Sequence, residues 1–159
     1  MKNFKIVPLS EELANSVRAS KKDLFGNDVK IQQANGRGPC RQSLQPFIPG
    51  KDNRILFVYS PFDKPGLYAE TGPVFINESP VETYSDIYRF PPEIKANKES
   101  FPLSLIGYDT ADMMVFTQLV GDRDVDNLIE KIFNEETKVA YLHARNSQAC
   151  CFICKIERI

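Results

Sequence analysis

The fold expected for the end of this 159-residue chain follows from the stretch Val139–Ile159, which reads VAYLHARNSQACCFICKIERI. Apolar and polar residues alternate from Val139 to Arg145, which predicts a strand with one face against a core. Asn146-Ser147-Gln148 has the composition of a turn, because Asn and Ser side chains bond to nearby backbone. The run Ala149–Ile156 is rich in β-branched and aromatic residues and predicts a returning strand. The chain is therefore expected to end in a β-hairpin.

The two faces of this hairpin are expected to differ in chemistry. One face of the first strand carries polar groups, on Tyr141, His143 and Arg145, and the opposite face is apolar. Strict alternation in the returning strand predicts two sets of residues, namely Cys150, Phe152 and Cys154 on one face and Cys151, Ile153 and Lys155 on the other. A hairpin would bring His143 and Arg145 close to the start of the cysteine run.

Composition indicates one ordinary globular domain, residues 1–159, which is long enough to bury a core. Twenty basic and twenty-one acidic residues leave a formal net charge of −1, so no basic excess favours nucleic-acid binding. No apolar run has the length of a membrane span, and no membrane partner is expected. The first residues, MKNFKIVPLSEEL, lack the apolar region of a signal peptide. We expect a cytoplasmic protein whose four cysteines are thiols.

The rest of the chain predicts a mixture of strands and two helices. Short strands are expected at 4–7 and 29–32, and the apolar run 54–60 predicts a central strand. Ser10 followed by two glutamates predicts the start of a helix, and the apolar spacing in 124–133 predicts a second. Two further strands are expected at 103–108 and 113–119. The expected fold class is α+β: a single domain with a mostly antiparallel sheet, two helices and the C-terminal hairpin.

Several of these segments, taken in order, carry a resemblance to a known family. They are Gly38–Arg41 with Leu44, Ile55–Phe62, Tyr68–Phe75, Leu105–Asp109, Asp112–Val115, and Val139–His143 with Arg145, Asn146 and Cys151. In these segments the chain resembles the bacterial domain of unknown function 1203 family over nearly its whole length. The resemblance implies a cytosolic bacterial protein and carries no established activity. Residues 77–100 resemble the family least.

A polar cluster is the main candidate for a functional site. Its members are the two arginines Arg41 and Arg145, with Tyr68, Glu70, His143 and Asn146. Two arginines suit a carboxylate or phosphate, and a histidine with a glutamate suits acid–base chemistry near neutral pH. The alternative is structural: Glu70 pairs with Arg41 or Arg145 as an internal salt bridge, and His143 bonds within the sheet.

The cysteines suggest two other chemistries. Cys40 follows a Gly-Pro turn and precedes Arg41, so it is the best candidate for a nucleophilic thiol, although free cysteines are more often buried hydrophobes. Cys151 and Cys154 have the C-x-x-C spacing of zinc ligands, but no turn residues separate them and no second pair accompanies them. Core cysteines are therefore the preferred interpretation, and no metal site or cofactor is predicted.

The hypothesis that follows is a pocket that binds or transforms a small anionic molecule. In it Arg41, Tyr68, Arg145 and Asn146 hold the ligand, His143 is the acid–base group, Glu70 orients it, and Cys40 is the candidate thiol. The alternative is a non-enzymatic interaction module in which the excursion 77–100, with Tyr84, Tyr88 and Phe90, contacts a protein partner.

Overall fold

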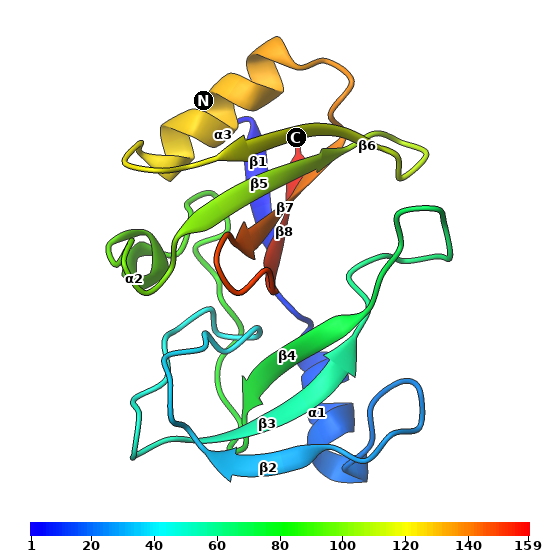
Figure 1. The fold of residues 1–159 in the computed structure, drawn as a ribbon, viewed down its shortest axis with the longest axis vertical. Helices are drawn as coiled ribbons and strands as arrows, with labels where there is room; N and C mark the ends of the chain where they lie inside the picture. Colours follow the sequence, from blue (N-terminus) through cyan, green and yellow to red (C-terminus); the bar gives the residue numbers. More distant parts are fainter.

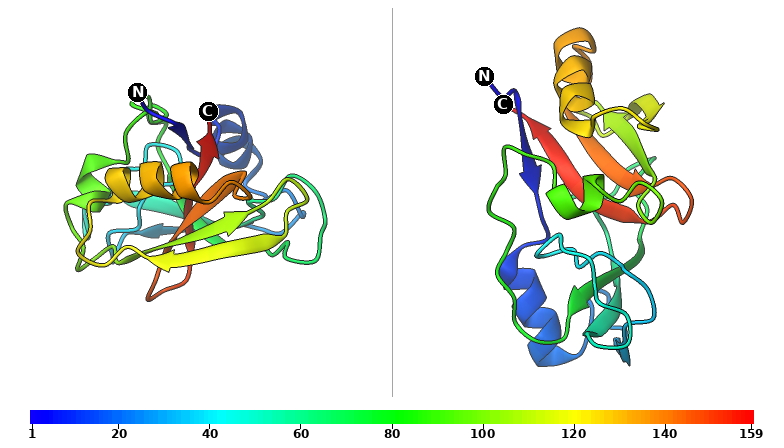
Figure 2. Two further views of the ribbon diagram at one scale, coloured as in Figure 1. Left: turned by 90° about the horizontal axis from the view of Figure 1, so that it is seen from above. Right: turned by 90° about the vertical axis from the view of Figure 1, so that its left-hand side faces the viewer.

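The C-terminal hairpin lies inside the larger of two antiparallel sheets in a computed structural model of the protein, which describes residues 1–159 (Figure 1). This sheet has five strands in the order β1-β8-β7-β5-β6. The strands are β1 (Phe4–Val7), β5 (Leu103–Tyr108), β6 (Met114–Leu119), β7 (Tyr141–Asn146) and β8 (Phe152–Arg158). The first and last segments of the chain pair as β1 and β8, so the two termini lie close together (Figure 2).

The smaller sheet has three strands in the order β2-β3-β4, all antiparallel. They are β2 (Lys30–Gln33), β3 (Asn53–Tyr59) and β4 (Gly72–Asn77). The apolar run predicted as a central strand is β3, which pairs with a neighbour on each side. The two sheets form the upper and lower halves of the molecule in Figure 1.

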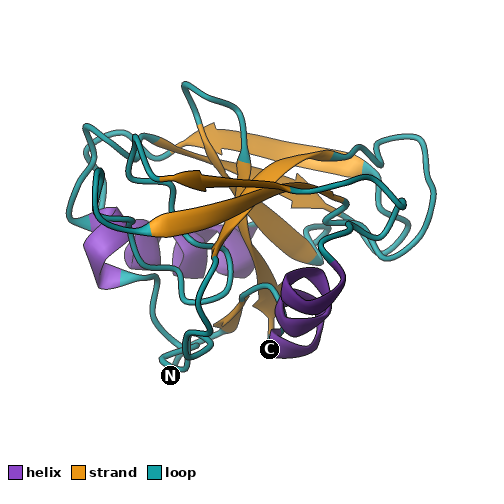
Figure 3. Ribbon diagram, turned by 90° about the horizontal axis from the view of Figure 1, so that it is seen from below, coloured by secondary structure: helices purple, strands orange, loops and turns teal.

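Three helices cover these sheets, and seen from below they lie to the outside of the strands (Figure 3). Helix α1 (Glu11–Ser20) begins at Ser10, whose hydroxyl accepts a hydrogen bond from the Leu13 amide at 3.2 Å. Helix α3 (Val125–Glu135) begins in the same way at Asp124, which accepts from the Asn127 amide at 2.9 Å. The short α2 (Pro92–Lys95) was not predicted, because its four residues are too few to show helical periodicity.

Each sheet has its own core. The larger core joins α3 to the inner face of the larger sheet, where Leu105, Leu142 and Ala144 are fully buried. The smaller core packs α1 against the smaller sheet, with Ala14 and Ile55 fully buried. The second face of the larger sheet, which carries Tyr141, His143 and Arg145, is directed at the smaller sheet and the loop that follows β3.

The α+β class, the single domain, the antiparallel pairing and the C-terminal hairpin are confirmed. The prediction of one main sheet missed the division of the strands into two sheets, because which strands pair is decided by contacts distant in sequence. The predicted alternation in β8 was wrong at its start. The pairing of β7 and β8 shifts register between Ala144 and Arg145, so Phe152 lies opposite Arg145 and joins the His143 face, while Cys154 faces the larger core.

Gly38 is required where the chain turns toward Cys40 and Arg41. Its φ is +80°, and a Cβ there would lie 2.4 Å from the ring of the buried Phe47. We expect Gly38→Ala to lower the free energy of unfolding by about 1–3 kcal/mol, because overpacking adds to backbone strain. Urea denaturation measures the loss.

Gly26→Ala is a matched control for this substitution. Gly26 has a φ of +81°, but no atom lies within 4 Å of the position that a Cβ would take, so its substitution reports backbone strain alone. Equal losses in the two variants would contradict the expected clash with Phe47.

Candidate functional site

Arg41 joins the two sheets at their junction. Its backbone amide donates to the Phe75 carbonyl of β4 at 2.9 Å, and its carbonyl accepts from the Leu9 amide at 2.9 Å. Its Nε donates to the Phe152 carbonyl of β8 at 2.6 Å, and Nη1 donates to the Pro39 carbonyl. Arg41 thus holds one strand from each sheet through its own backbone and side chain.

The Arg41 guanidinium is buried without an acidic partner. The side chain is only 1% exposed, and its hydrogen bonds go to neutral carbonyl groups. Burial lowers the pKa of Arg41, while the neighbouring thiols of Cys151 and Cys40 oppose that shift. Arginine stays protonated in proteins even when its pKa is lowered, so one positive charge at this junction is not balanced by a carboxylate.

A crevice of about 250 Å³ opens at the same junction. Strand β3 and the loop between β3 and β4 contribute Tyr59, Glu70 and Thr71, and the C-terminal hairpin contributes Arg145 and Cys151. Tyr59 and Phe152 both line the crevice, with ring centroids 5.8 Å apart. The crevice is therefore a gap between the two sheets, with polar groups on both sides.

Arg145 and Glu70 meet across this crevice. Arg145 Nη2 lies 3.1 Å from Glu70 Oε1, and Nη1 donates to the Cys150 carbonyl at 3.4 Å. The Arg145 side chain is 14% exposed, whereas that of Glu70 is 65% exposed. Although Nη2 is close to the carboxylate, the angle is poor and this buried atom has no well-aligned hydrogen-bond acceptor. The pair is an open contact that solvent reaches from the Glu70 side.

Tyr108 also contacts the Arg145 guanidinium. Burial raises the pKa of Tyr108, and the nearby positive charge of Arg145 opposes that shift. The phenol consequently stays neutral at physiological pH. Arg145 is held between a neutral hydroxyl and an exposed carboxylate.

His143 is enclosed by aromatic rings and does not line the crevice. Its ring centroid lies 4.9 Å from those of Phe62 and Tyr108, 5.0 Å from Phe152 and 5.4 Å from Tyr141. The residue is 0% exposed, and neither ring nitrogen has a hydrogen-bond partner. The expected acid–base group is thus shut away from solvent by Phe62 and Phe152.

The surroundings of His143 keep its imidazole neutral. Burial lowers its pKa to about 3, and the positive charges of Arg145 and Lys155 act in the same direction. A neutral imidazole adds no charge, so the positive charges beside His143 are those of Arg145 and Lys155.

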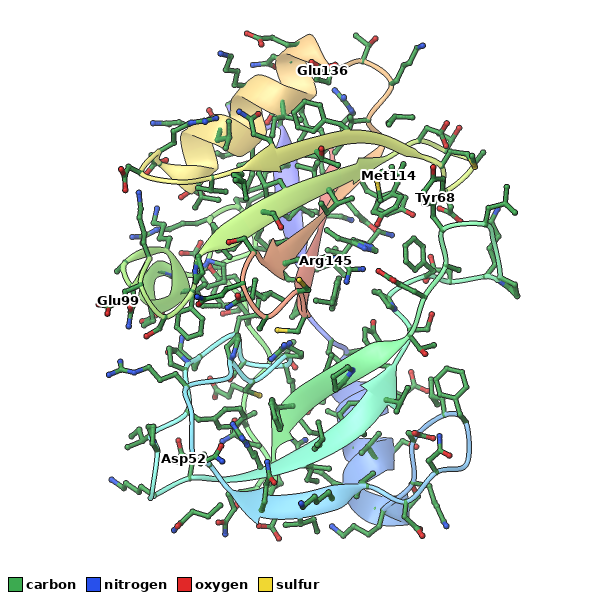
Figure 4. The ribbon with its side chains drawn as sticks, viewed as in Figure 1. Asp52, Tyr68, Glu99, Met114, Glu136 and Arg145 are labelled. Carbon is green, nitrogen blue, oxygen red and sulfur yellow. The ribbon has the colours of Figure 1, made fainter.

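The other candidate residues are spread around the junction. Cys40 is 0% exposed and packs in the smaller core, next to Arg41. Tyr68 is 41% exposed on the loop that leads to Glu70, and Figure 4 shows it at the edge of the molecule, with Arg145 between the sheets. Asn146 is 8% exposed and shapes the hairpin turn, because its side-chain oxygen accepts from the amides of Gln148 and Ala149 at 2.9 and 2.8 Å.

The structure therefore brings some of the predicted residues together and keeps others apart. Glu70 and Arg145 face each other, and Arg41 lies behind Cys151 on the inner side of the crevice. Sequence reasoning missed Tyr59, Thr71 and Cys151 as lining residues. No sequence signal identifies them, because the register shift in the hairpin and the meeting of two sheets place them there.

The excursion 77–100 packs against the body of the protein along much of its length. Phe90 is 0% exposed in the larger core, and the Tyr84 hydroxyl donates to the Arg89 carbonyl at 2.7 Å. Tyr88 is 52% exposed. Of the three aromatic residues named for a partner surface, Tyr88 alone is exposed.

Three other features bear on the class of site. All four cysteines are unpaired, and no three His, Cys, Asp or Glu side chains gather closely enough to hold a metal ion. None of the helices is both long and apolar enough to cross a membrane. The candidate site is thus a crevice at the junction of two sheets, lined by the Arg145 guanidinium, the Glu70 carboxylate and the thiols of Cys150 and Cys151, with the Arg41 guanidinium behind Cys151.

These features define an α+β protein with two antiparallel sheets and a polar crevice between them. A sequence model of the family described as "Protein of unknown function (DUF1203)" matches residues 37–158, nearly the whole chain. The protein belongs to this family, and the expected resemblance is confirmed. No curated protein and no solved structure shows significant similarity to the chain.

The buried imidazole has a consequence for stability below neutral pH. The pKa of His143 is about 3 in the folded protein and about 6.5 when unfolded, so the unfolded state binds more protons between these values. Stability contributed by the neutral imidazole is present above pH 6.5 and falls as the pH falls toward 3. We expect this group alone to lower the free energy of unfolding by about 3 kcal/mol between pH 6.5 and pH 4.

Comparing the wild type with His143→Leu isolates this effect. The free energy of unfolding, measured by urea denaturation across this pH range, should fall less steeply in the variant. Parallel pH profiles would show that His143 does not resist protonation in the folded protein.

Proposed function

We propose that the protein binds a small anionic molecule, an organic acid or a phosphate, in the crevice between its two sheets. Arg145 is the residue that contacts the anion, Arg41 supplies a second positive charge from behind Cys151, and Glu70 occupies the place of the ligand when the site is empty. One observation carries the proposal: the largely buried Arg145 guanidinium lines the crevice with a solvent-exposed carboxylate as its acidic partner, and the buried charge of Arg41 lies behind Cys151.

Charge balance supports an anion rather than a cation. Arg41 and Arg145 contribute two positive charges to the junction, and Glu70 contributes one negative charge. Because Arg41 is buried, water screens its charge poorly, and the crevice keeps a positive potential even while Glu70 is in contact with Arg145. A bound carboxylate or phosphate would lower the cost of this unbalanced charge.

The geometry of Arg145 supports ligand exchange with Glu70. The guanidinium is largely buried and fixed, whereas the Glu70 side chain is mostly in solvent and free to turn away. An exposed ion pair contributes about 0–1 kcal/mol, so displacing Glu70 costs little. A ligand carboxylate that approaches in line with Nη2 would satisfy the poorly aligned donor with a charge-assisted hydrogen bond.

The volume and lining of the crevice limit the ligand to a small molecule. The cavity of about 250 Å³ is below the usual range for drug-sized ligands. The hydroxyl group of Thr71 and the phenol of Tyr59 are available as further polar contacts. Cys151 offers a thiol next to the Arg41 guanidinium.

The proposal concerns the binding of a ligand and assigns no chemical step to the protein. A chemical step by His143, with Glu70 and Cys40, would first require Phe62 or Phe152 to move, because these rings separate the imidazole from the crevice. We place this binding function in the bacterial cytoplasm, where the thiols of Cys150 and Cys151 would stay reduced.

Two substitutions with opposite expected effects test the proposal. Arg145→Gln removes the direct contact and should weaken binding of malonate or inorganic phosphate about tenfold or more, as loss of a charge-assisted hydrogen bond implies. Glu70→Gln removes the competing carboxylate and should strengthen binding of the same anions. Calorimetric titration at low ionic strength measures both affinities.

Lys30→Gln is the control, because it removes one positive charge from exposed β2 in the smaller sheet, outside the crevice lining. Its affinity for malonate should match that of the wild type. If Glu70→Gln binds no more tightly than the wild type and instead loses stability, the Arg145–Glu70 pair is a structural salt bridge and the proposal is wrong.

A further inference from the structure

A second cavity, of about 630 Å³, lies away from the crevice, between α2 and the turn that leads from β6 into α3. Figure 1 shows these two elements on the same side of the molecule. This cavity and the crevice have no lining residue in common. The turn of the C-terminal hairpin borders both, and its Ser147 lines the cavity. Its volume is typical of a pocket that holds a small organic molecule.

The floor of this cavity is apolar and rigidly built. Four floor residues from three different segments are almost fully buried, namely Phe101, Leu103, Val120 and Val125. The Val120 amide donates to the Leu103 carbonyl at 2.9 Å, so the two sides of the floor are tied together. Leu119 is 63% exposed at the edge, where it offers apolar surface that no part of this chain covers.

The rim of the cavity carries more basic than acidic side chains. Four basic side chains, Arg89, Lys95, Lys98 and Arg123, stand against two acidic ones, Asp122 and Asp124. Two of the four basic groups have acidic neighbours beyond the rim, since Arg89 lies 4.0 Å from Asp86 and Lys95 is bonded to Asp126.

The basic groups of the rim differ in how far they are already engaged. Lys95 is bonded to the buried Asp126 and lies 4.0 Å from Asp124, so its charge is used within the protein. The Lys98 ammonium donates to the Arg123 carbonyl at 3.0 Å, which leaves its charge without an acidic partner. The Arg123 guanidinium is exposed and forms no ion pair. Lys98 and Arg123 are thus free to receive an anion.

We infer that this cavity binds an amphipathic organic anion, a molecule with an apolar body and one carboxylate. The apolar body would lie on the floor around Val120 and cover Leu119, while the carboxylate would meet Lys98 and Arg123 at the rim. A purely polar anion leaves the floor in contact with water, and a neutral apolar molecule leaves the two charges unpaired. The combination selects a ligand that has both parts.

Three related molecules test this inference by NMR titration of the isotope-labelled protein. Octanoate has both parts of the expected ligand, acetate has only the carboxylate, and 1-octanol has only the chain. Octanoate should bind most tightly and shift the amide signals of Val120, Gly121 and Arg123. If 1-octanol binds as tightly as octanoate, or if the shifts fall elsewhere, the inference is wrong.

Two variants and a control locate the contacts. Arg123→Gln removes a rim charge, and Leu119→Ser removes exposed apolar surface, and neither side chain is part of the core. Each should weaken octanoate binding about fivefold or more, which corresponds to about 1 kcal/mol. Lys51→Gln, on the loop between β2 and β3, should leave the affinity unchanged. An unchanged affinity in Arg123→Gln and Leu119→Ser would overturn the inference.

The crevice does not enter this test, so its result stands independently of the proposed function. A protein that binds octanoate here but no malonate at Arg145 would support this inference and contradict the proposal for the crevice. The reverse result would contradict this inference alone.

Discussion

The fork of hydrogen bonds made by Arg41 is the constraint on which the arrangement of the two sheets depends. Each sheet has its own core, and Arg41 is among the largest fully buried side chains of the protein, at the point where they meet. Its guanidinium reaches the Phe152 carbonyl of the larger sheet, and its backbone is bonded to Phe75 of the smaller. A planar group with several fixed donors serves this role, and a single ammonium group does not.

The same residue accounts for the character of the crevice. A buried guanidinium without a carboxylate partner leaves positive potential at the junction, and Arg145 adds a second charge on the open side. The acidic residue that lines the crevice is Glu70, which is mostly in solvent. His143 lies two residues before Arg145 on the same strand face. It adds no positive charge, because burial among aromatic rings keeps its imidazole neutral. The junction thus separates groups that the sequence analysis had placed in one pocket, because the Arg145 guanidinium lines the crevice and the imidazole is enclosed by aromatic rings.

Much of the fold was predictable from local patterns, whereas the site was predictable only in part. Alternation in Tyr141–Arg145 and the apolar spacing of 124–133 reflect local periodicity, and the corresponding strand and helix formed where expected. The pairing of Arg145 with Glu70 was one of two alternatives, and only the tertiary fold selects it. The burial of His143 depends on Phe62, from a loop distant in sequence, and on the register shift that turns Phe152 toward it. No periodicity in the sequence indicates such contacts.

The substitution Arg41→Lys shows whether the hydrogen bonds of Arg41 hold the two sheets together, through its effect on the free energy of unfolding. Lysine keeps the positive charge but cannot reach both the Phe152 and Pro39 carbonyls, so the account expects a loss of about 2–4 kcal/mol, as for removal of a buried charged hydrogen-bond network. Urea denaturation followed by both circular dichroism and tyrosine fluorescence gives this value. A variant as stable as the wild type would contradict the account, because the junction would then be held together without the fork.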